Sequence, residues 1–310
     1  MKAIRIHAPG GLAGISYDEI PQPQVAPGEV LVRVYASGLS PKEITWTTST
    51  GQLRPLPATL GFEFSGVVAA LGEGVTNLSI GSEVYGKPDF KKGGTQAEYL
   101  TIQADELALK PVSIGHLEAS AIPLSGLTAW QALFEQAHIL PGQTVLIHGA
   151  AGGVGMFAVQ LAHWAQAKII ATASTDNQAF VAGLGADELI DYNRTRFEEV
   201  VHGVDVVIDM VGGDALNRSW GVLKPGGILV TVADVNIGDL KTKAIEWGVQ
   251  AVWFLVTSNS AQLKQIAELI DAGHLKPQIE TVFPLSQALQ AYEEGLKGHN
   301  RGKLVLQIVS

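Results

Sequence analysis

The stretch Thr144–Gly155, which reads TVLIHGAAGGVG, decides the fold of this 310-residue chain. Its first five residues are mostly apolar and β-branched, which predicts a buried strand over 144–148. The glycine-rich turn after this strand opens into residues 154–165, whose apolar positions repeat at helical spacing, and a second apolar strand is predicted over 168–173. This order brings backbone N–H groups and the positive end of a helix dipole to a pyrophosphate, so we predict dinucleotide binding. The alternative is a tight strand–helix turn without a ligand.

The alternation of helices with apolar strands continues to about residue 256. Further strands are predicted over 188–190, 204–209, 227–232 and 251–256, and helices over 117–133, 177–184 and 215–223. Continuous apolar strands joined by helices indicate an α/β fold with a Rossmann-type, doubly wound parallel sheet. Residues 1 to about 110 have short β-branched runs separated by Pro and Gly instead, which is typical of a β-rich domain.

The C-terminal segment combines both patterns. Helices are predicted over 260–272 and 286–296, and strands over 281–283 and 303–309. Because the chain ends in a strand with β-rich flanks, we expect this segment to return and complete the first domain. The predicted domains are therefore residues 1–121 with 259–310 for a β-rich substrate domain, and residues 122–258 for a nucleotide-binding domain.

The charge balance excludes several classes of partner. The chain has 21 Lys and Arg against 30 Asp and Glu, a net charge of −9, which disfavours nucleic acids and anionic membranes. No apolar run reaches the roughly 18 residues that a membrane span requires, and the first residues have no signal-peptide pattern. We expect a cytoplasmic protein that binds a small molecule.

The residue types also limit metal chemistry. The chain has no Cys, which excludes disulfides, iron–sulfur clusters, Cys-built zinc sites and cysteine nucleophiles. Its eight His residues are dispersed and form no close pair. We therefore expect no metal site.

The end of the second strand of the nucleotide domain bears on the choice of dinucleotide. An NAD site places an acidic residue there to bind the ribose 2′-hydroxyl, but this chain has Ala173. Ser174 and Asn177 are small polar groups that suit a 2′-phosphate, whereas Asp176 counts against one and no basic residue is near in the sequence. This pattern favours NADPH over NADH. The alternative is that these residues only cap the next helix.

Four segments together resemble the medium-chain dehydrogenase/reductase superfamily, specifically its zinc-free quinone oxidoreductase branch. They are residues 123–155, Leu60–Val68 (LGFEFSGVV), Leu223–Gly227 (LKPGG) and Gly298–Leu306 (GHNRGKLVL), and the similarity spans essentially the whole chain. The resemblance implies a GroES-like domain made from both chain ends, a Rossmann domain between them, and a substrate held between the two domains. Zinc-dependent relatives have a Cys where Ser40 stands and a His where Phe62 stands, so catalytic zinc is not expected.

The resemblance also carries functional positions over to this chain. The segment Ser40–Glu43 matches a motif that usually reads Asn-Pro-x-Asp, and Thr128 matches a residue that contacts the nicotinamide. Trp46 is a candidate to flank a planar acceptor, and Glu63 to order the loop below the cofactor. The candidate residues are catalytic Ser40, Glu43 and Thr128; substrate-binding Trp46, Glu63 and Phe254; and cofactor-binding Gly149, Ala151, Gly152, Gly153, Val154, Gly155, Ser174, Asn177, Tyr192, Val232, Ala233 and Arg301.

Each of these positions also has a structural reading. Ser40 and Glu43 depart from the family motif and also fit a solvent-facing polar loop, and Trp46 also fits core packing. The Thr128 hydroxyl also fits a bond back to the preceding helical turn, and Arg301 a turn into the last strand.

A site without a zinc Lewis acid suits an acceptor that is already electron-poor. The sequence therefore predicts an NADPH-dependent oxidoreductase that transfers hydride to a quinone or an activated alkene such as an enone. Two alternatives remain: an alcohol or aldehyde dehydrogenase with another metal arrangement, and an NADPH-binding redox sensor with poor turnover. We also expect a homodimer in which the strand 251–256 extends the sheet, the alternative being a strand within a monomer.

Overall fold

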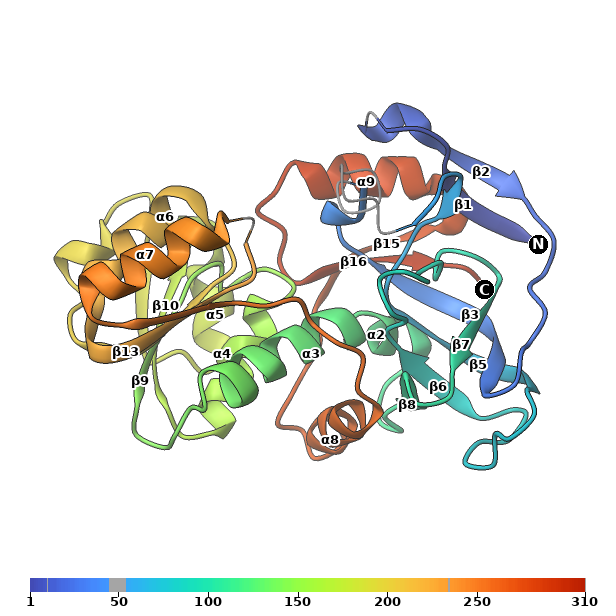
Figure 1. Ribbon diagram of the computed structural model, residues 1–310, viewed down its shortest axis with the longest axis horizontal. Coiled ribbons are helices and arrows are strands. Elements are labelled where there is room, and N and C mark those ends of the chain that lie inside the picture. Colours follow the sequence, from blue (N-terminus) through green and yellow to red (C-terminus); the bar gives the residue numbers. More distant parts are fainter. Residues whose placement is uncertain (10, 45–53, 234, 310) are drawn as a thin grey trace. The chain divides into compact units, whose positions relative to one another are not determined.

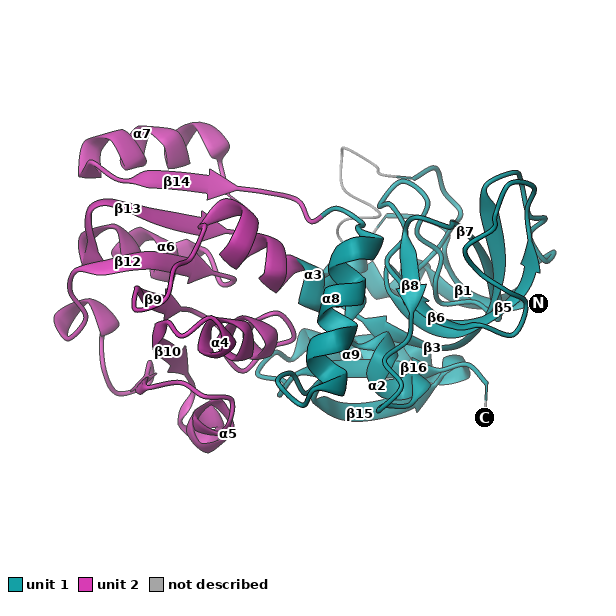
Figure 2. Cartoon of the chain, turned by 90° about the horizontal axis from the view of Figure 1, so that it is seen from below, with its two compact units in different colours: residues 1–127, 257–310 teal, residues 128–256 magenta. Residues whose placement is uncertain are grey.

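The computed structural model describes residues 1–9, 11–44, 54–233 and 235–309. Residues 1–127 and 257–310 form one compact unit, and residues 128–256 form the other (Figure 2). These are called unit 1 and unit 2. The family-based domain boundaries, after residues 121 and 258, stay a prediction beside these contact-based bounds.

Unit 2 is built on a six-stranded sheet in which every neighbouring pair is parallel. The strand order is β11-β10-β9-β12-β13-β14. The bounds are β9 Thr144–Ile147, β10 Lys168–Ala173, β11 Glu188–Asp191, β12 Val204–Asp209, β13 Leu223–Thr231 and β14 Gln250–Trp253. The chain adds strands outward on one side from β9 and then on the other from β12, which confirms the doubly wound prediction and places a topological switch point between these two strands.

Helices connect these strands, and their sequence patterns account for them. They are α4 Gly155–Trp164, η3 Thr175–Asn177, α5 Gln178–Gly183, η4 Phe197–Glu199, α6 Gly213–Ser219, η5 Trp220–Val222 and α7 Ile237–Trp247. The apolar residues of α4 are buried, where the helix packs against β9 and β10. Trp220 is 1% exposed and lies in the core cluster that also includes Leu146 and Leu229.

The strand predicted over 251–256 is wrong in extent, because β14 ends at Trp253. Among the described strands its one neighbour is β13, and the last pair in their register is Thr231 with Trp253. Since β13 also ends at Thr231, the residues after Trp253 have no partner strand in the described part of the chain. Phe254 therefore follows the end of β14 and is not part of the sheet.

Unit 1 contains a seven-stranded and a three-stranded sheet. The larger has the order β15-β16-β3-β5-β6-β8, with β7 also pairing with β3, and the smaller is β2-β1-β4. The bounds are β1 Lys2–Ile6, β2 Ile15–Glu19, β3 Glu29–Leu39, β4 Ala58–Thr59, β5 Phe64–Leu71, β6 Glu83–Gly86, β7 Tyr99–Gln103, β8 Leu107–Leu109, β15 Ile279–Pro284 and β16 Lys303–Gln307. The C-terminal strand β16 pairs antiparallel with β3 (Figure 1), which confirms that both chain ends build one domain.

The helices with assigned bounds in the described part of unit 1 are η1 Gly11–Gly14, α2 His116–Ser120, α8 Ser260–Asp271, η6 Leu285–Gln287 and α9 Ala288–Leu296, while α3 Pro123–Trp130 begins in unit 1 and ends in unit 2. The single helix predicted over 117–133 is instead α2, α3 and the π-helix η2 Gln131–Gln136. Pro123 explains the first break, since proline has no N–H to continue α2 but fits the first position of α3. No helix in the described part of the chain is both long and apolar enough to cross a membrane.

Candidate functional site

The turn between β9 and α4 can form only with glycine at its two ends. Gly149 has a φ of +70°, a conformation that favours glycine. A Cβ on Gly155 would overlap the Gly149 carbonyl oxygen and lie 2.7 Å from the Ala150 Cα. The helix therefore starts close against the strand end, and neither an acidic residue in its first turn nor a side-chain cap neutralises its amino end. Such an end attracts an anion.

A buried histidine supports this turn from beneath. His148 follows β9, and its Nδ1 lies 3.0 Å from the Thr172 Oγ1 while its Nε2 lies 3.0 Å from the Ser219 Oγ. Burial lowers the pKa of His148 to about 4, so the ring is neutral and one nitrogen donates while the other accepts. His148 thus joins β9, β10 and α6 next to the glycine turn.

Asp209, at the end of β12, orders the neighbouring loops. Its carboxylate accepts hydrogen bonds from the Val211 and Gly212 N–H groups and from the Thr231 hydroxyl. The Thr231 Oγ1 in turn accepts from the Ala233 N–H at 3.1 Å. These two hydrogen bonds therefore hold the backbone of the segment that contains the predicted cofactor residues Val232 and Ala233. The sequence analysis missed Asp209, which looks like any strand-end acid until its partners are known.

The fold brings a basic residue to the end of β10. The Thr175 hydroxyl donates to the Asp191 Oδ2 at 2.6 Å, and the Arg194 Nε lies 3.3 Å from the same oxygen. Arg194 is 73% exposed. Arg194 was not predicted because it lies far from Ala173 in the sequence. The fold brings the two residues together, since β10 and β11 are neighbours in the sheet.

The other predicted residues around β10 lie close to this strand end. Ser174 follows Ala173 directly, and the Tyr192 N–H donates to the Ala173 carbonyl at 3.3 Å. Tyr192 is 45% exposed, Asn177 is buried and Asp176 is exposed. The fold therefore gathers Ser174, Tyr192 and Arg194 at one corner of the sheet.

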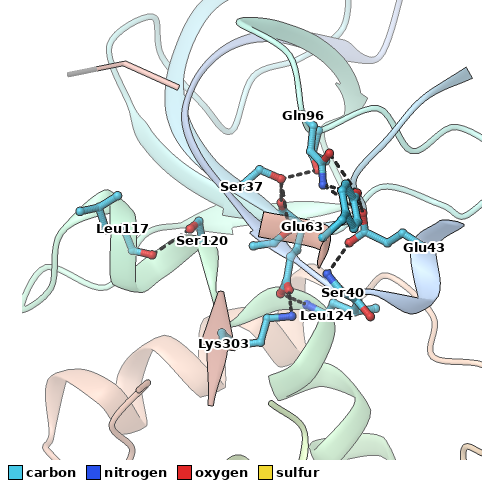
Figure 3. Close-up of polar contacts among 12 residues, drawn as sticks. Ser37, Ser40, Glu43, Glu63, Gln96, Leu117, Ser120, Leu124 and Lys303 are labelled. Atoms are coloured by element: carbon cyan, nitrogen blue, oxygen red, sulfur yellow. Dashed lines mark hydrogen bonds and ion pairs between the residues drawn. The ribbon is translucent and has the colours of Figure 1, made fainter. Parts of the chain in front are cut away.

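In unit 1, four strand ends meet at one edge of the seven-stranded sheet. Leu39 at the end of β3 pairs with Leu304 at the start of β16, and Phe64 at the start of β5 pairs with Gly86 at the end of β6. The residues just beyond these pairs carry polar or charged groups. They are Ser40, Glu63, Lys87 and Lys303. Figure 3 shows Ser40, Glu63 and Lys303 in this cluster.

Glu43 is fully buried and holds the loop that carries Ser40. Its Oε1 accepts from the Ser40 N–H at 2.8 Å, and its Oε2 accepts from the Tyr292 hydroxyl at 2.8 Å and the Gln96 amide at 3.0 Å (Figure 3). Burial, which outweighs these bonds, raises the pKa of Glu43 to about 7. The described hydrogen bonds of this carboxyl thus all go to other groups of the protein, and the bond from the Ser40 N–H fixes the position of Ser40.

Glu63 is also fully buried and ties three elements together. Its Oε1 lies 2.6 Å from the Lys303 Nζ, and its Oε2 accepts from the Leu124 N–H at 2.9 Å. Leu124 is in the first turn of α3, where a carboxylate also interacts favourably with the helix dipole. Thr128 lies one turn further along this helix and is buried. These contacts are consistent with the prediction that Glu63 orders the surrounding chain, which stays a prediction.

An aromatic cluster surrounds Phe62, a position at which the family resemblance predicts no zinc ligand. The Phe62 ring lies 4.8 Å from the Phe90 ring, with the Arg54 guanidinium 5.0 Å from its centre. None of these groups is a zinc ligand. In the described residues, no group of three His, Asp or Glu side chains is placed to hold a metal ion.

The remaining predicted residues are not brought into these clusters by the described contacts. Trp46 lies outside the described residues. Phe254 is half-buried beyond β14, and Arg301 is exposed in the turn before β16. The sequence analysis did not single out Tyr292, Gln96 or Lys87, since nothing in their local sequence marks them.

Comparison with known proteins agrees with this arrangement. Residues 26–112 match the family model of the alcohol dehydrogenase GroES-like domain, and residues 184–306 match that of a zinc-binding dehydrogenase. The mitochondrial NAD(P)H oxidoreductase RTN4IP1 of Mus musculus is 32% identical over 91% of this chain and 82% of its own length. The 2-methylene-furan-3-one reductase of Solanum lycopersicum is also 32% identical, over 92% of this chain and 73% of its own length.

A solved structure extends the similarity to the whole chain. The quinone oxidoreductase from Coxiella burnetii is 35% identical, with a TM-score of 0.94 and 99% of both chains covered. With these relatives the chain is an oxidoreductase that uses a nicotinamide nucleotide. The chain belongs to the medium-chain dehydrogenase/reductase superfamily, within its zinc-free quinone oxidoreductase branch.

Proposed function

We propose that this protein is an NADPH-dependent reductase that delivers hydride to a quinone or to an activated alkene such as an enone. The observation that carries the proposal is the glycine turn of unit 2, which leads into an uncapped helix beside a strand end that has Ala173 in place of an acid. Glycine at position 155 lets the helix start close against the strand end, where the backbone N–H groups of the turn can approach a dinucleotide phosphate.

The preference for NADPH is supported by the corner formed by the ends of β10 and β11. A carboxylate at the end of β10 would repel a 2′-phosphate, but that position is Ala173. Ser174 offers a hydroxyl, and Arg194 offers a mostly exposed guanidinium that suits a phosphate. Asp191 already pairs with Arg194, so the phosphate would share this cation.

The protein's share of the reaction is to bind, orient and exclude water. A bound reduced nicotinamide supplies the hydride. The β9–α4 turn would hold the pyrophosphate, and the ordered segment Val232–Ala233 would border the nicotinamide. In unit 1, the Glu43 carboxyl fixes the Ser40 loop at the edge where the substrate is expected.

The substrate class follows from the chemistry of positions 40 and 62. Ser40 is a poor zinc ligand and Phe62 is none, so the acceptor must be electron-poor without the help of zinc. Quinones and enones meet this requirement. The names of the Coxiella quinone oxidoreductase and the tomato 2-methylene-furan-3-one reductase support the same two classes.

The test is a set of steady-state assays with the purified full chain. NADPH and NADH are each offered with a series of quinones, enones and saturated aldehydes, and the loss of reduced nicotinamide is followed. The proposal expects turnover of quinones or enones with NADPH. Reduction of saturated aldehydes alone would favour an alcohol dehydrogenase, and tight NADPH binding without turnover of any acceptor would favour a redox sensor.

The proposal includes a homodimer formed through β14. This strand is at the edge of the six-stranded sheet, and Trp253 and Leu255 beside that edge are 37% and 47% exposed. An unpaired edge with apolar side chains is suited to pairing with a second copy. The mass of the protein in solution tests this proposal. The wild type should have the mass of a dimer. Val252→Pro, which removes a backbone N–H from this edge strand, should have the mass of a monomer.

A further inference from the structure

The described part of the chain contains three buried lysines, and they differ in how their charges are paired. Lys303 lies 2.6 Å from the Glu63 carboxylate. Lys110 donates to two carbonyls, at 2.9 and 2.6 Å, and lies 3.3 Å from the Glu83 carboxylate. Lys87 is only 1% exposed, yet among the described residues its ammonium has a single acceptor, the Pro88 carbonyl at 3.3 Å.

An unpaired buried ammonium costs the fold stability, so its presence calls for a reason. An ammonium has three N–H donors, and the described contacts of Lys87 use one of them. The Lys87 Nζ also lies 3.9 Å from the centre of the Phe90 ring, a contact that favours the cation without using a hydrogen bond. Two donors are therefore left for a further acceptor.

The position of Lys87 links it to the candidate site. Lys87 directly follows β6, one step beyond the Phe64–Gly86 pair, and so stands across from Glu63. It shares this sheet edge with Ser40, and Phe90 connects it to Phe62 through a ring contact of 4.8 Å. The Lys87 ammonium thus lies beside the aromatic cluster of Phe62 and Phe90.

We propose that the Lys87 ammonium binds the oxygen of the hydride acceptor and donates the proton that completes its reduction. This inference rests on the proposed function and gives it a catalytic residue. The site would accept a planar carbonyl compound whose oxygen becomes negatively charged during the reaction. Phe62 and Phe90, which are 0% and 5% exposed, form the aromatic side of the ammonium's surroundings.

The proposed step balances in electrons and protons. As hydride forms a C–H bond at the β-carbon of an enone, the C=C π electrons move and leave a negative charge on the carbonyl oxygen. One N–H bond of Lys87 breaks, its proton goes to that enolate, and the saturated ketone results after tautomerisation. The enone is reduced by two electrons, the nicotinamide is oxidised, and the neutral Lys87 amine takes a proton from water.

The charges around Lys87 are consistent with proton donation. Burial lowers the pKa of Lys87 to about 8, and this effect outweighs the opposing influence of Asp89, Glu106 and Glu63. A donor with a pKa close to the working pH is effective because it both holds a proton and releases it. Activity should therefore fall as the pH rises through the pKa of this group.

The experiment compares Lys87→Met and Lys87→Arg with two controls. Lys92→Met changes an exposed lysine of the same loop, and Lys110→Met changes a buried lysine that is paired. Three properties are measured: turnover of an enone against pH, thermal stability, and the absorbance of 4-nitrophenol added to the chain without nucleotide. The phenolate form of this probe carries the planar, negatively charged oxygen that the site is proposed to bind.

Lys87→Met should lower kcat about a hundredfold and abolish the alkaline fall of the pH profile. Its midpoint of thermal unfolding should rise, because an unpaired buried charge is removed, whereas Lys110→Met should unfold at a lower temperature. The wild type should shift bound 4-nitrophenol about tenfold toward phenolate, and Lys87→Met should not. Lys87→Arg should keep this shift but lose turnover, because arginine releases its proton too reluctantly. Lys92→Met should behave as the wild type.

Contrary results separate this inference from the proposed function. If the wild type reduces enones but Lys87→Met keeps its kcat and pH profile, the role of Lys87 is refuted and the proposed function stands. A wild type that does not shift 4-nitrophenol toward phenolate also contradicts the inference. If no quinone or enone is reduced by the wild type, the proposed function fails, while the probe still reports whether Lys87 binds an oxyanion.

Discussion

The two units build their candidate sites from different materials. In unit 2 the site is made by the backbone: a glycine turn, the amino end of α4 and loops fixed by Asp209. In unit 1 it is made by buried ionisable side chains from distant segments, among them Glu43, Glu63 and Lys303. A site of the first kind depends on space and N–H groups, whereas one of the second kind depends on charge balance. Mutations should therefore affect the two units in different ways.

The largest expected effect concerns the buried ion pair of unit 1. Lys303→Met leaves the Glu63 carboxylate without its counter-ion in a position that is 0% exposed, and should lower the free energy of unfolding by about 3 to 5 kcal/mol. Lys168→Met is the matched control, because the Lys168–Glu188 pair is about half exposed and its loss should change the free energy of unfolding much less. Urea unfolding measures both. Equal losses in the two variants would refute the importance of buried charge in unit 1.

The next effect is the pH dependence caused by Glu43. Its pKa of about 7 in the folded chain exceeds the ordinary 4.5, so the folded state holds a proton that the unfolded state releases. The stability is therefore fully present below pH 4.5 and falls as the pH rises through 7, by on the order of 3 kcal/mol in total.

Glu43→Gln removes this titration, since the amide stays neutral. The groups that face Glu43 include Tyr292, Gln96, Lys303, Glu63 and the Arg54 guanidinium. Subtracting the unfolding curves of the variant from those of the wild type isolates the contribution of Glu43. A difference that does not change between pH 4.5 and 7 would contradict the raised pKa.

The backbone-built site should respond to added volume. Gly155→Ala places a Cβ against the Gly149 carbonyl and should weaken NADPH binding about a hundredfold, or about 2.7 kcal/mol. Gly183→Ala is the control, because a Cβ at that helical position meets nothing within 4 Å. Fluorescence titration with NADPH measures the affinity, and circular dichroism checks the fold. Unchanged affinity in a folded Gly155→Ala protein would mean that the turn does not hold the nucleotide.

The smallest expected effect concerns cofactor preference. Arg194→Ala should lower the affinity for NADPH about tenfold, or about 1.4 kcal/mol, and leave the affinity for NADH unchanged. Arg196→Ala is the control, because Arg196 pairs with Glu198 and Glu199 and has no described contact at the β10 corner. The ratio of the two dissociation constants is the readout. An equal loss for both nucleotides would exclude a role in reading the 2′-phosphate.

The difference between the backbone-built site of unit 2 and the side-chain site of unit 1 also explains which features could be predicted from the sequence. The doubly wound sheet and the turn of unit 2 were predicted because glycine spacing and apolar periodicity are local signals. The break at Pro123 has a local cause in the proline itself, which the predicted helix over 117–133 did not take into account. The wrong extent of the last strand of unit 2 depends on which partner strands are available, which local patterns do not show. Asp209 and Arg194 were missed for this reason as well.

The charged cluster of unit 1 could be predicted only in part. Glu43 and Glu63 were selected through the family resemblance, but their partners Tyr292, Gln96 and Lys303 come from segments that meet only in the folded chain. Lys87 has no local signal at all, because a buried lysine and an exposed one look the same in a sequence. Trp46, which the resemblance also selected, lies outside the described residues.

The most direct test of the proposed chemistry follows the hydride itself. NADPH labelled with deuterium at C4 of the nicotinamide is incubated with the purified chain and an enone, and the product is examined by NMR. We expect deuterium at the β-carbon of the saturated ketone, with NADH reacting more slowly. A label that stays in the nucleotide, or that appears at the carbonyl carbon of an alcohol product, would contradict hydride transfer to an activated alkene.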